Sequence, residues 1–150
     1  MGAPETEPVG LHLTRAAKTV SRAFDDALAE AGGSLPLWLI LVSLKGQAHG
    51  AQRQLAEAVG VEGPTLTHHL NRMESAGLVT RRRDPDNRRV HQVELTPSGE
   101  ATFFALLDTV VAFDERLRHD LSDRELAQLR RLLDRLAANA TVKGLPPAPR

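Results

Sequence analysis

Hydrophobic residues recur with a helical period at the beginning of the chain. Between residues 9 and 31 they are spaced three and four positions apart, until Gly32-Gly33 interrupt the pattern. A second segment, residues 37–44, follows Pro36 and is apolar almost all round. Proline is favoured in the first turn of a helix, and a helix without a polar face must be buried. The sequence therefore predicts an amphipathic helix followed by a buried one.

Two further segments with the helical period lie near the end of the chain. The first begins at Thr96-Pro97, and the second begins at the capping box Ser122-Asp123-Arg124-Glu125. Apolar residues cover more than one face of the first helix and one stripe of the second: Phe103, Phe104, Leu106, Leu107, Val110, Val111, Phe113 and Leu117, then Leu126, Leu129, Leu132, Leu133 and Leu136. One small core cannot bury all of these side chains, so we expect a partner chain to cover some of them.

A helix-turn-helix pattern lies in the middle of the chain, after a loop expected at residues 46–50. Residues 54–59 form a short amphipathic segment, and Gly60 follows it in the place of a C-terminal glycine. After a short turn, Leu66, Leu70 and Met73 form one apolar stripe at helical spacing. The other faces of this second helix carry hydrogen-bonding side chains: Thr65, Thr67, His68, His69, Asn71 and Arg72. Two helices joined by a short turn in this way are typical of helix-turn-helix DNA-binding proteins.

A basic β-hairpin is predicted directly after the helix-turn-helix. Gly77 ends the second helix, and residues 78–80 begin an extended run that leads into Arg81-Arg82-Arg83. Asp84-Pro85-Asp86-Asn87 marks a turn, because Asp and Asn side chains bond their own backbone and proline presets φ. Residues 90–95 return as a strand. This is the winged-helix arrangement, in which one helix enters the major groove and hairpin arginines reach the backbone or the adjacent minor groove.

Several short motifs follow one another in order through this region. They are Ala56-Glu57-Ala58-Val59-Gly60-Val61, Thr65-Leu66-Thr67, Arg72-Met73-Glu74-Ser75-Ala76-Gly77-Leu78-Val79, Asp84-Pro85-Asp86-Asn87-Arg88-Arg89 and Leu95-Thr96-Pro97-Ser98-Gly99. Together they resemble the MarR family of bacterial transcriptional regulators, which implies a homodimeric DNA-binding regulator. Two residues depart from the family pattern: His68 stands where an arginine or similar residue is usual, and Asn87 replaces an aspartate that normally orients a wing arginine. Asn87 cannot form that ion pair, although an amide still accepts a hydrogen bond.

Composition and charge set limits on the class of protein. The chain has 150 residues, of which 41% are hydrophobic and 25% charged, as expected for one globular domain. The formal net charge is zero, but residues 45–91 hold eight basic against five acidic residues, a local charge of +3. Because phosphate neutralisation supplies much of the affinity for DNA, we expect binding that weakens steeply with salt. The absence of cysteine excludes disulfides, cysteine metal sites and peroxide sensing by a thiol.

These patterns predict a mainly α-helical fold with a small β-hairpin wing. Residues 35–96 would form the winged helix-turn-helix, residues 9–34 and 97–140 the dimerisation helices, residues 1–8 a disordered tail and residues 141–150 a flexible one. No apolar run approaches the ~20 residues of a membrane helix, so we expect a cytoplasmic protein without a membrane partner. A twofold dimer would hold two recognition helices about 34 Å apart and read a pseudo-palindromic operator in double-stranded DNA.

The candidate DNA-binding residues come from the start of the helix-turn-helix, its second helix and the wing. They are Gln52, Arg53, Thr65, Thr67, His68, His69, Arg72, Arg82, Arg83, Asn87, Arg88 and Arg89. Arginine can bind guanine with two hydrogen bonds, threonine can bind phosphate or contact a thymine methyl, and an imidazole N–H can reach a purine N7. An alternative is that His69 or Arg72 packs on the helix above or pairs with Glu57 or Glu74. One wing arginine is also expected to be structural.

The family resemblance further implies a small-molecule effector. Family members often bind phenolic or other lipophilic molecules between the dimerisation helices and the winged helix, which weakens DNA binding. The residues that would line such a pocket here are His12, Arg15, Phe24, Trp38, Phe103 and Phe104, although each also suits an ordinary structural role. An effector would favour a separation of the two recognition helices that does not match the groove spacing.

Enzymatic and metal chemistry have weak support. The sequence has no Gly-rich phosphate loop, no nucleophile elbow and no cysteine, so we expect no catalytic residue and no cofactor. Among its six histidines, only His119 with Glu115 comes near the spacing of a helical zinc site, and two ligands do not suffice. Two alternatives to a repressor released by a small ligand remain open. They are a metal-responsive regulator of the same fold and a winged-helix protein-interaction module that does not bind DNA.

Overall fold

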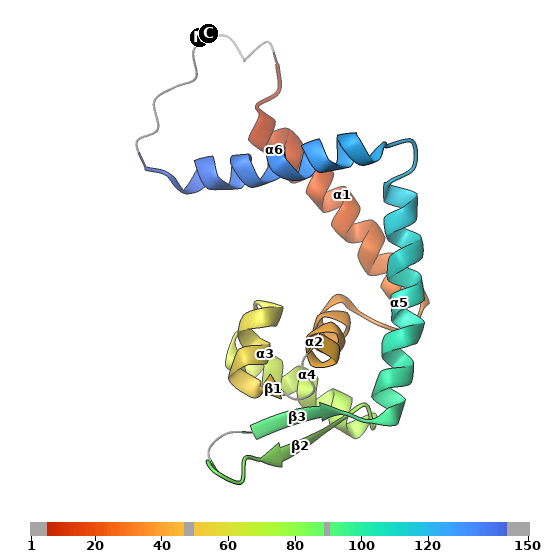
Figure 1. Cartoon of the computed structure of the whole chain (residues 1–150), viewed down its shortest axis with the longest axis vertical. Coiled ribbons are helices and arrows are strands. Elements are labelled where there is room, and N and C mark those ends of the chain that lie inside the picture. Colours follow the sequence, from red (N-terminus) through yellow and green to blue (C-terminus); the bar gives the residue numbers. More distant parts are fainter. Residues whose placement is uncertain (1–5, 47–49, 89–90, 144–150) are drawn as a thin grey trace. The chain divides into compact units, whose positions relative to one another are not determined.

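The computed structural model of the protein describes residues 6–46, 50–88 and 91–143 (Figure 1). Within these residues the chain forms α1 (Val9–Glu30), α2 (Leu35–Gly46), β1 (Gly50–Ala51), α3 (Gln52–Val59), α4 (Gly63–Ser75), β2 (Val79–Arg83), β3 (His91–Leu95), α5 (Pro97–Leu117) and α6 (Asp123–Thr141). This mainly helical arrangement with a hairpin confirms the predicted fold class. Residues up to Phe113 form one compact unit, and residues from Asp114 onward form a second. The predicted tails, residues 1–8 and 141–150, fall largely outside the described residues.

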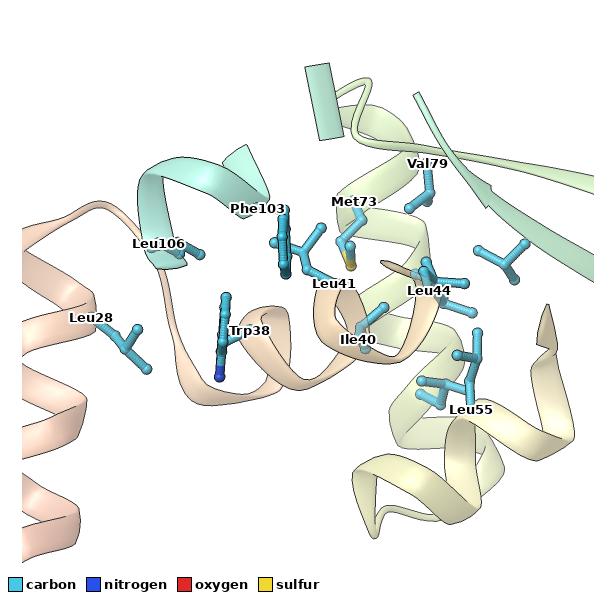
Figure 2. Packing of buried hydrophobic residues seen from close by; sticks show 13 residues of the cluster. Leu28, Trp38, Ile40, Leu41, Leu44, Leu55, Met73, Val79, Phe103 and Leu106 are labelled. Carbon is cyan, nitrogen blue, oxygen red and sulfur yellow. The ribbon is translucent and has the colours of Figure 1, made fainter. Parts of the chain in front are cut away.

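The core of the first unit is built around α2. Trp38, Ile40, Leu41 and Leu44 are all buried, and α2 packs against α3, α4 and β3. Figure 2 shows side chains from α1, α3, α4 and α5 joining these residues in one cluster. This explains the nearly unbroken apolar sequence of α2, because a helix surrounded by other elements has little face left for water. Each fully buried Leu or Ile contributes about 1.5–3 kcal/mol.

The helix-turn-helix forms as the sequence predicts. α3 ends at Gly60, whose φ of 74° is the left-handed conformation that favours glycine. The Gly60 and Val61 amides donate to the Ala56 carbonyl at 2.9 and 3.1 Å, which closes the end of the helix. In α4 the stripe of Leu66 and Leu70 is fully buried. The opposite face of α4 is therefore directed away from the core.

The wing is part of a three-stranded antiparallel sheet with the order β1-β3-β2. β2 and β3 pair from Val79 with Leu95 to Arg83 with His91. The loop expected at residues 46–50 is wrong at both ends, because Gly46 is the last residue of α2 and Gly50 pairs with β3 as the start of β1. Residues 47–49 lie outside the described residues. A two-residue strand is too short to show the alternation by which strands are detected in a sequence.

A close junction joins the end of α4 to the beginning of α5. The Leu78 amide donates to the Met73 carbonyl at 2.9 Å, and the Thr96 amide donates to the Leu78 carbonyl at 3.0 Å. The Thr96 hydroxyl donates to the Gly77 carbonyl and accepts from the Gly99 amide at 3.0 Å. A Cβ atom on Gly99 would lie 2.0 Å from the Leu78 oxygen. Glycine is therefore required for this close packing.

In the second unit, α6 begins with the predicted capping box. The Glu125 amide donates to the Ser122 hydroxyl at 3.3 Å, and the Glu125 carboxylate accepts from the Ser122 amide at 2.8 Å. These backbone and side-chain hydrogen bonds lower the pKa of Glu125 below its ordinary value. The capping box thus stabilises the first turn of α6 when the Glu125 carboxylate is ionised.

Among the described residues, no single helix is long and apolar enough to cross a membrane, although α1 and α2 meet the length and composition criteria as a pair bent by 79°.

Candidate nucleic-acid interface

The outward face of α4 carries most of the predicted contact residues of this helix. Leu66, Leu70 and Met73 are buried on one side of α4. The helix exposes polar side chains to solvent, among them Thr65, His68, Asn71 and Arg72. The ring of His68 lies 5.9 Å from that of His69 in an edge-on contact. These side chains can donate and accept hydrogen bonds, as reading base edges requires.

Thr67 and Gln52 form a latch between the two helices of the motif. The Gln52 amide donates to the Thr67 hydroxyl at 2.7 Å, and that hydroxyl donates to the Gly63 carbonyl at 3.0 Å. The hydrogen bond between the two side chains is partly buried. The structure therefore gives these two predicted contact residues a second role, which is to fix the angle between α3 and α4.

His69 and Arg72 lie on the side of α4 that faces the loop between α1 and α2. They line a hollow of about 450 Å³ together with Gly32, Gly33, Ser34, Pro36, Leu37, Met73, Ala76 and Leu78. The alternative in which these residues pair with Glu57 or Glu74 is not favoured, because both carboxylates face other arginines. Glu57 lies 3.9 Å from Arg53, and Glu74 binds Arg81.

Arg81 on β2 forms hydrogen bonds to side chains on α4. Its Nε donates to Glu74 at 2.8 Å, and its Nη2 donates to both Glu74 and Asn71. Arg81 is not among the candidate residues chosen from the sequence. Strand alternation indicates only the face of β2 on which Arg81 lies, because two residues after the buried Val79 the chain returns to the same face; it does not indicate the partners on α4.

The other wing arginines are more exposed. Arg82 binds Glu94 across the hairpin, with 69% of its side chain exposed. Arg83 and Arg88 are exposed, as is Asn87, while Arg89 lies outside the described residues. Arg82 is thus partly neutralised by Glu94, whereas Arg83 and Arg88 extend the basic surface toward the tip of the wing.

Asp84 organises the wing turn. Its two carboxylate oxygens accept from the Asp86 amide at 2.8 Å and from the Gln92 side chain at 3.0 Å. The first contact is the local side-chain to backbone bond predicted for this turn. The second ties the turn to β3, so the hairpin tip is held from both sides.

The start of α3 lines a second, larger hollow. This open hollow of about 980 Å³ is bounded by Ala51, Gln52, Arg53, Gln54, Ala56, Glu57, Gly60, Val61, Glu62, Gly63, Thr67 and His91. Arg53 stands at its edge with 92% of its side chain exposed. The start of α3 and the beginning of α4 therefore share one concave surface with the wing residue His91.

Comparison with known proteins matches this architecture. Residues 34–91 match the model of the MarR family. The transcriptional repressor CouR bound to a 23-mer DNA duplex is 27% identical, with a TM-score of 0.79 over 87% of this chain and 92% of that chain. A MarR-family transcriptional regulator from Rhodococcus sp. RHA1 is 26% identical, with a TM-score of 0.76 over 91% of this chain and 96% of that chain.

The part of the chain that holds the winged helix-turn-helix is thus similar to the MarR family. A mutant MarR from E. coli complexed with operator DNA is also similar, with 25% identity and a TM-score of 0.76 over 86% of this chain and 93% of that chain. The two DNA-bound structures therefore share the winged-helix architecture of this chain.

Of the six residues predicted to line a MarR-type effector pocket, three lie in contact: Trp38, Phe103 and Phe104, with the ring centres of Phe103 and Phe104 5.2 Å apart. Trp38 and Phe103 stack in the core with ring centres 5.5 Å apart, and Phe24 packs against Phe113. Phe104 is 51% exposed and contacts Lys45, whose Nζ lies 5.2 Å from the ring centre.

The other two members of that set lie on the exposed surface of α1. His12 and Arg15 both pair with Glu7, with 76% and 68% of their side chains exposed. Most of the aromatic members therefore have core contacts in one chain, as the alternative interpretation of the sequence allowed. Among the residues that the structure describes, no group of three or more His, Cys, Asp or Glu side chains is placed to hold a metal ion.

Proposed function

We propose that this chain is a MarR-family transcriptional regulator, and that it is a repressor that binds a pseudo-palindromic operator as a homodimer in the cytoplasm. The observation that carries the proposal is the juxtaposition of two surfaces. α4 presents hydrogen-bonding side chains on its outward face, and the neighbouring wing presents exposed arginines. Operator recognition needs both features, because base contacts give specificity and phosphate contacts give register and affinity.

In this proposal α4 lies in the major groove. His68 and Arg72 approach base edges, and Thr65 contacts a phosphate or a thymine methyl. His69 and Arg72 both border the hollow beside the α1–α2 loop, but His69 is partly buried whereas Arg72 is exposed, so His69 contributes less to base reading. Gln52 and Thr67 act chiefly by fixing the angle between α3 and α4, since their polar atoms already bind each other.

The wing contacts the DNA beside the major-groove site. Arg83 and Arg88 reach the sugar-phosphate backbone or the adjacent minor groove, while Arg53 reaches phosphate from the start of α3. Arg82 contributes less because Glu94 already neutralises part of its charge. Asn87 and Arg89 are proposed as wing residues from their place in the sequence alone.

Exposed apolar side chains on the terminal helices support a homodimer. On α1, Val9, Leu11 and Val20 are 61%, 46% and 40% exposed, and on α6, Leu129 and Leu132 are 46% and 44% exposed. A second copy of the chain would cover such residues, each contributing up to about 1.5–3 kcal/mol when fully buried. A twofold dimer would then present two copies of α4 to half-sites about one helical turn apart.

We also propose that a small lipophilic or phenolic molecule releases the repressor, as the family resemblance implies. The hollow lined by His69 and Arg72 is favourable for such a ligand, because it combines apolar walls with two polar groups on α4. A ligand bound there would contact the recognition helix directly. The test is a screen of aromatic acids and phenols by thermal shift, in which a true effector raises the melting temperature and weakens DNA binding.

DNA binding itself is tested with a duplex recovered from a random pool. Fluorescence anisotropy is measured for the parent chain, for Arg83→Ala with Arg88→Ala, and for the control Arg130→Ala with Arg131→Ala on the exposed face of α6. We expect the wing variant to weaken binding and to reduce the salt slope by about 1 for each phosphate that is no longer neutralised. Equal binding by both variants would contradict the wing assignment. A folded parent that binds no duplex would favour the protein-interaction module.

A further inference from the structure

Arg81 connects the two elements that approach the DNA. It lies in the middle of β2, and its guanidinium makes three hydrogen bonds to residues on α4. Two of them go to the same carboxylate oxygen of Glu74, from Nε at 2.8 Å and from Nη2 at 2.6 Å. The third goes from Nη2 to the side-chain oxygen of Asn71. Glu74 and Asn71 are three positions apart on α4 and therefore share one side of the helix.

Burial and charge distinguish Arg81 from the neighbouring arginines. Its side chain is 20% exposed, compared with 69% for Arg82. Arg82 binds Glu94 within the hairpin, so that contact does not reach α4. Since the charge of Arg81 is matched by Glu74 and its donors point at α4, Arg81 is poorly placed to bind phosphate. Hydrogen bonds between charged groups are about twice as strong as neutral ones, and a partly buried pair is screened less by salt than an exposed one.

The Arg81 hydrogen bonds cross the turn that joins α4 to β2. α4 and β2 are joined by a turn in which Gly77 has a φ of 72°, and the apolar base of the wing is held by Val79 and Val93. Arg81 pairs with Val93 in the hairpin register and lies farther along the wing than Val79. It therefore fixes the wing at a second point, and two points define an angle between the wing and α4.

We propose that Arg81, Asn71 and Glu74 form a clamp that positions the wing relative to the recognition helix, so that both elements reach DNA together. This inference rests on the proposed operator binding. Arg81 is then a positioning residue whose effect on DNA affinity passes through the wing arginines. A binding site held in its productive geometry gains affinity because less ordering is left to occur on binding.

The chemistry of Asn71 provides a specific rescue. A guanidinium can only donate hydrogen bonds, so the Asn71 oxygen must face Arg81. An asparagine amide can reverse and donate from its nitrogen instead. Exchanging the charges, with Arg81→Glu and Glu74→Arg, therefore preserves every type of bond in the clamp, whereas either single change leaves two like charges together.

The experiment is a double-mutant cycle between the clamp and the wing. Operator affinity is measured by anisotropy for Arg81→Met, for Arg83→Ala with Arg88→Ala, and for all three changes combined, with Arg82→Met as the control for Arg81→Met. With Arg81 present, Arg83→Ala with Arg88→Ala should lower operator affinity. In the Arg81→Met background we expect the same two changes to cost about fivefold less affinity, or less still, which is a usual size for coupled residues. Arg82→Met removes a wing charge and so lowers affinity by itself, but it should leave the contribution of Arg83 and Arg88 nearly unchanged, because the ion pair of Arg82 with Glu94 does not reach α4.

Circular dichroism and thermal unfolding identify variants that bind poorly because they are unfolded. Should Arg81→Met fail to fold, Arg81→Lys replaces it in the cycle, because lysine keeps a charge for Glu74 but cannot form the same forked contact. The clamp is supported if the charge-exchanged double variant recovers most of the affinity that each single reversal removes. Additive effects in the cycle, or no recovery on exchange, would overturn it. A parent chain that binds no selected duplex would refute the proposed function, and the clamp with it; a parent that binds but shows additive effects would refute the clamp alone.

Discussion

Gly99 holds the first turn of α5 against the turn that follows α4, and its replacement by alanine should destabilise the protein. The new Cβ atom would lie 2.0 Å from the Leu78 carbonyl oxygen and 3.2 Å from a methyl carbon of Leu95. The first contact involves backbone and cannot be relieved by a side-chain rotation. The Leu78 oxygen also accepts the Thr96 amide, so moving α5 away strains the hydrogen bonds of the junction.

The expected size of this effect follows from three contributions. Overpacking in a well-packed region costs about 1–3 kcal/mol. Loss of the two hydrogen bonds that Thr96 makes to the turn adds roughly 0.5–1.5 kcal/mol each. Alanine is favoured over glycine inside a helix by about 1 kcal/mol, which offsets part of the cost. We therefore expect the free energy of unfolding of Gly99→Ala to fall by about 1–5 kcal/mol, a large share of the ~5–15 kcal/mol of an ordinary domain.

Urea unfolding followed by circular dichroism at one fixed protein concentration measures this change. Gly46→Ala is a suitable control, because Gly46 is also helical and has no atom within 4 Å of its built Cβ position. The control should be neutral or slightly stabilising. Ordinary surface substitutions change the free energy of unfolding by up to about 0.5 kcal/mol. If the free energy of unfolding of Gly99→Ala lies within that range of the parent value, the close contact between α5 and the turn after α4 would be contradicted.

Three further predictions concern the recognition helix and α6. His68→Ala should relax base preference at one position of each half-site by about 5- to 150-fold, whereas His69→Ala should leave base preference nearly intact. The two variants are compared by their binding to a panel of operators that each carry one changed base pair. Equal effects of the two variants would contradict the placement of the two rings. Leu133→Glu should shift the homodimer toward monomer in light scattering, and an unchanged mass would place the dimer contact elsewhere. Because hydrogen bonds from Ser122 depress the folded pKa of Glu125, its contribution to stability is present above the ordinary glutamate pKa of about 4.3 and is lost as pH falls through the lower folded value. Ser122→Ala should reduce α6 stability at neutral pH but have a smaller effect in acid, and a difference that does not depend on pH in thermal unfolding would contradict this assignment.

The helix-turn-helix was predictable because its signals are local. The spacing of Leu66, Leu70 and Met73 identifies the buried face of α4, and Gly60 marks the end of α3 by a conformation that other residues rarely adopt. The capping box at Ser122 was equally visible, since all of its atoms belong to four successive residues.

The features that could not be predicted depend on contacts between elements. β1 is a strand only because β3 lies beside it, and two residues contain no period. Arg81 belongs to a run of three arginines, and its separate role depends on how β2 packs against α4. Thr67 is polar and lies on the predicted contact helix, but its hydroxyl is already bound by Gln52. In each case the residue type determines the chemistry of the side chain, and the packing decides which partner it meets.

The most direct test of operator recognition by a homodimer is selection of bound duplexes from a random DNA pool, followed by a measurement of the mass of the complex. We predict an enriched inverted repeat with half-sites about one helical turn apart, two protein chains on each duplex, and affinity that falls steeply as salt rises. A folded protein that enriches no repeat, or that binds its best duplex as a single chain, would contradict operator recognition by a homodimer.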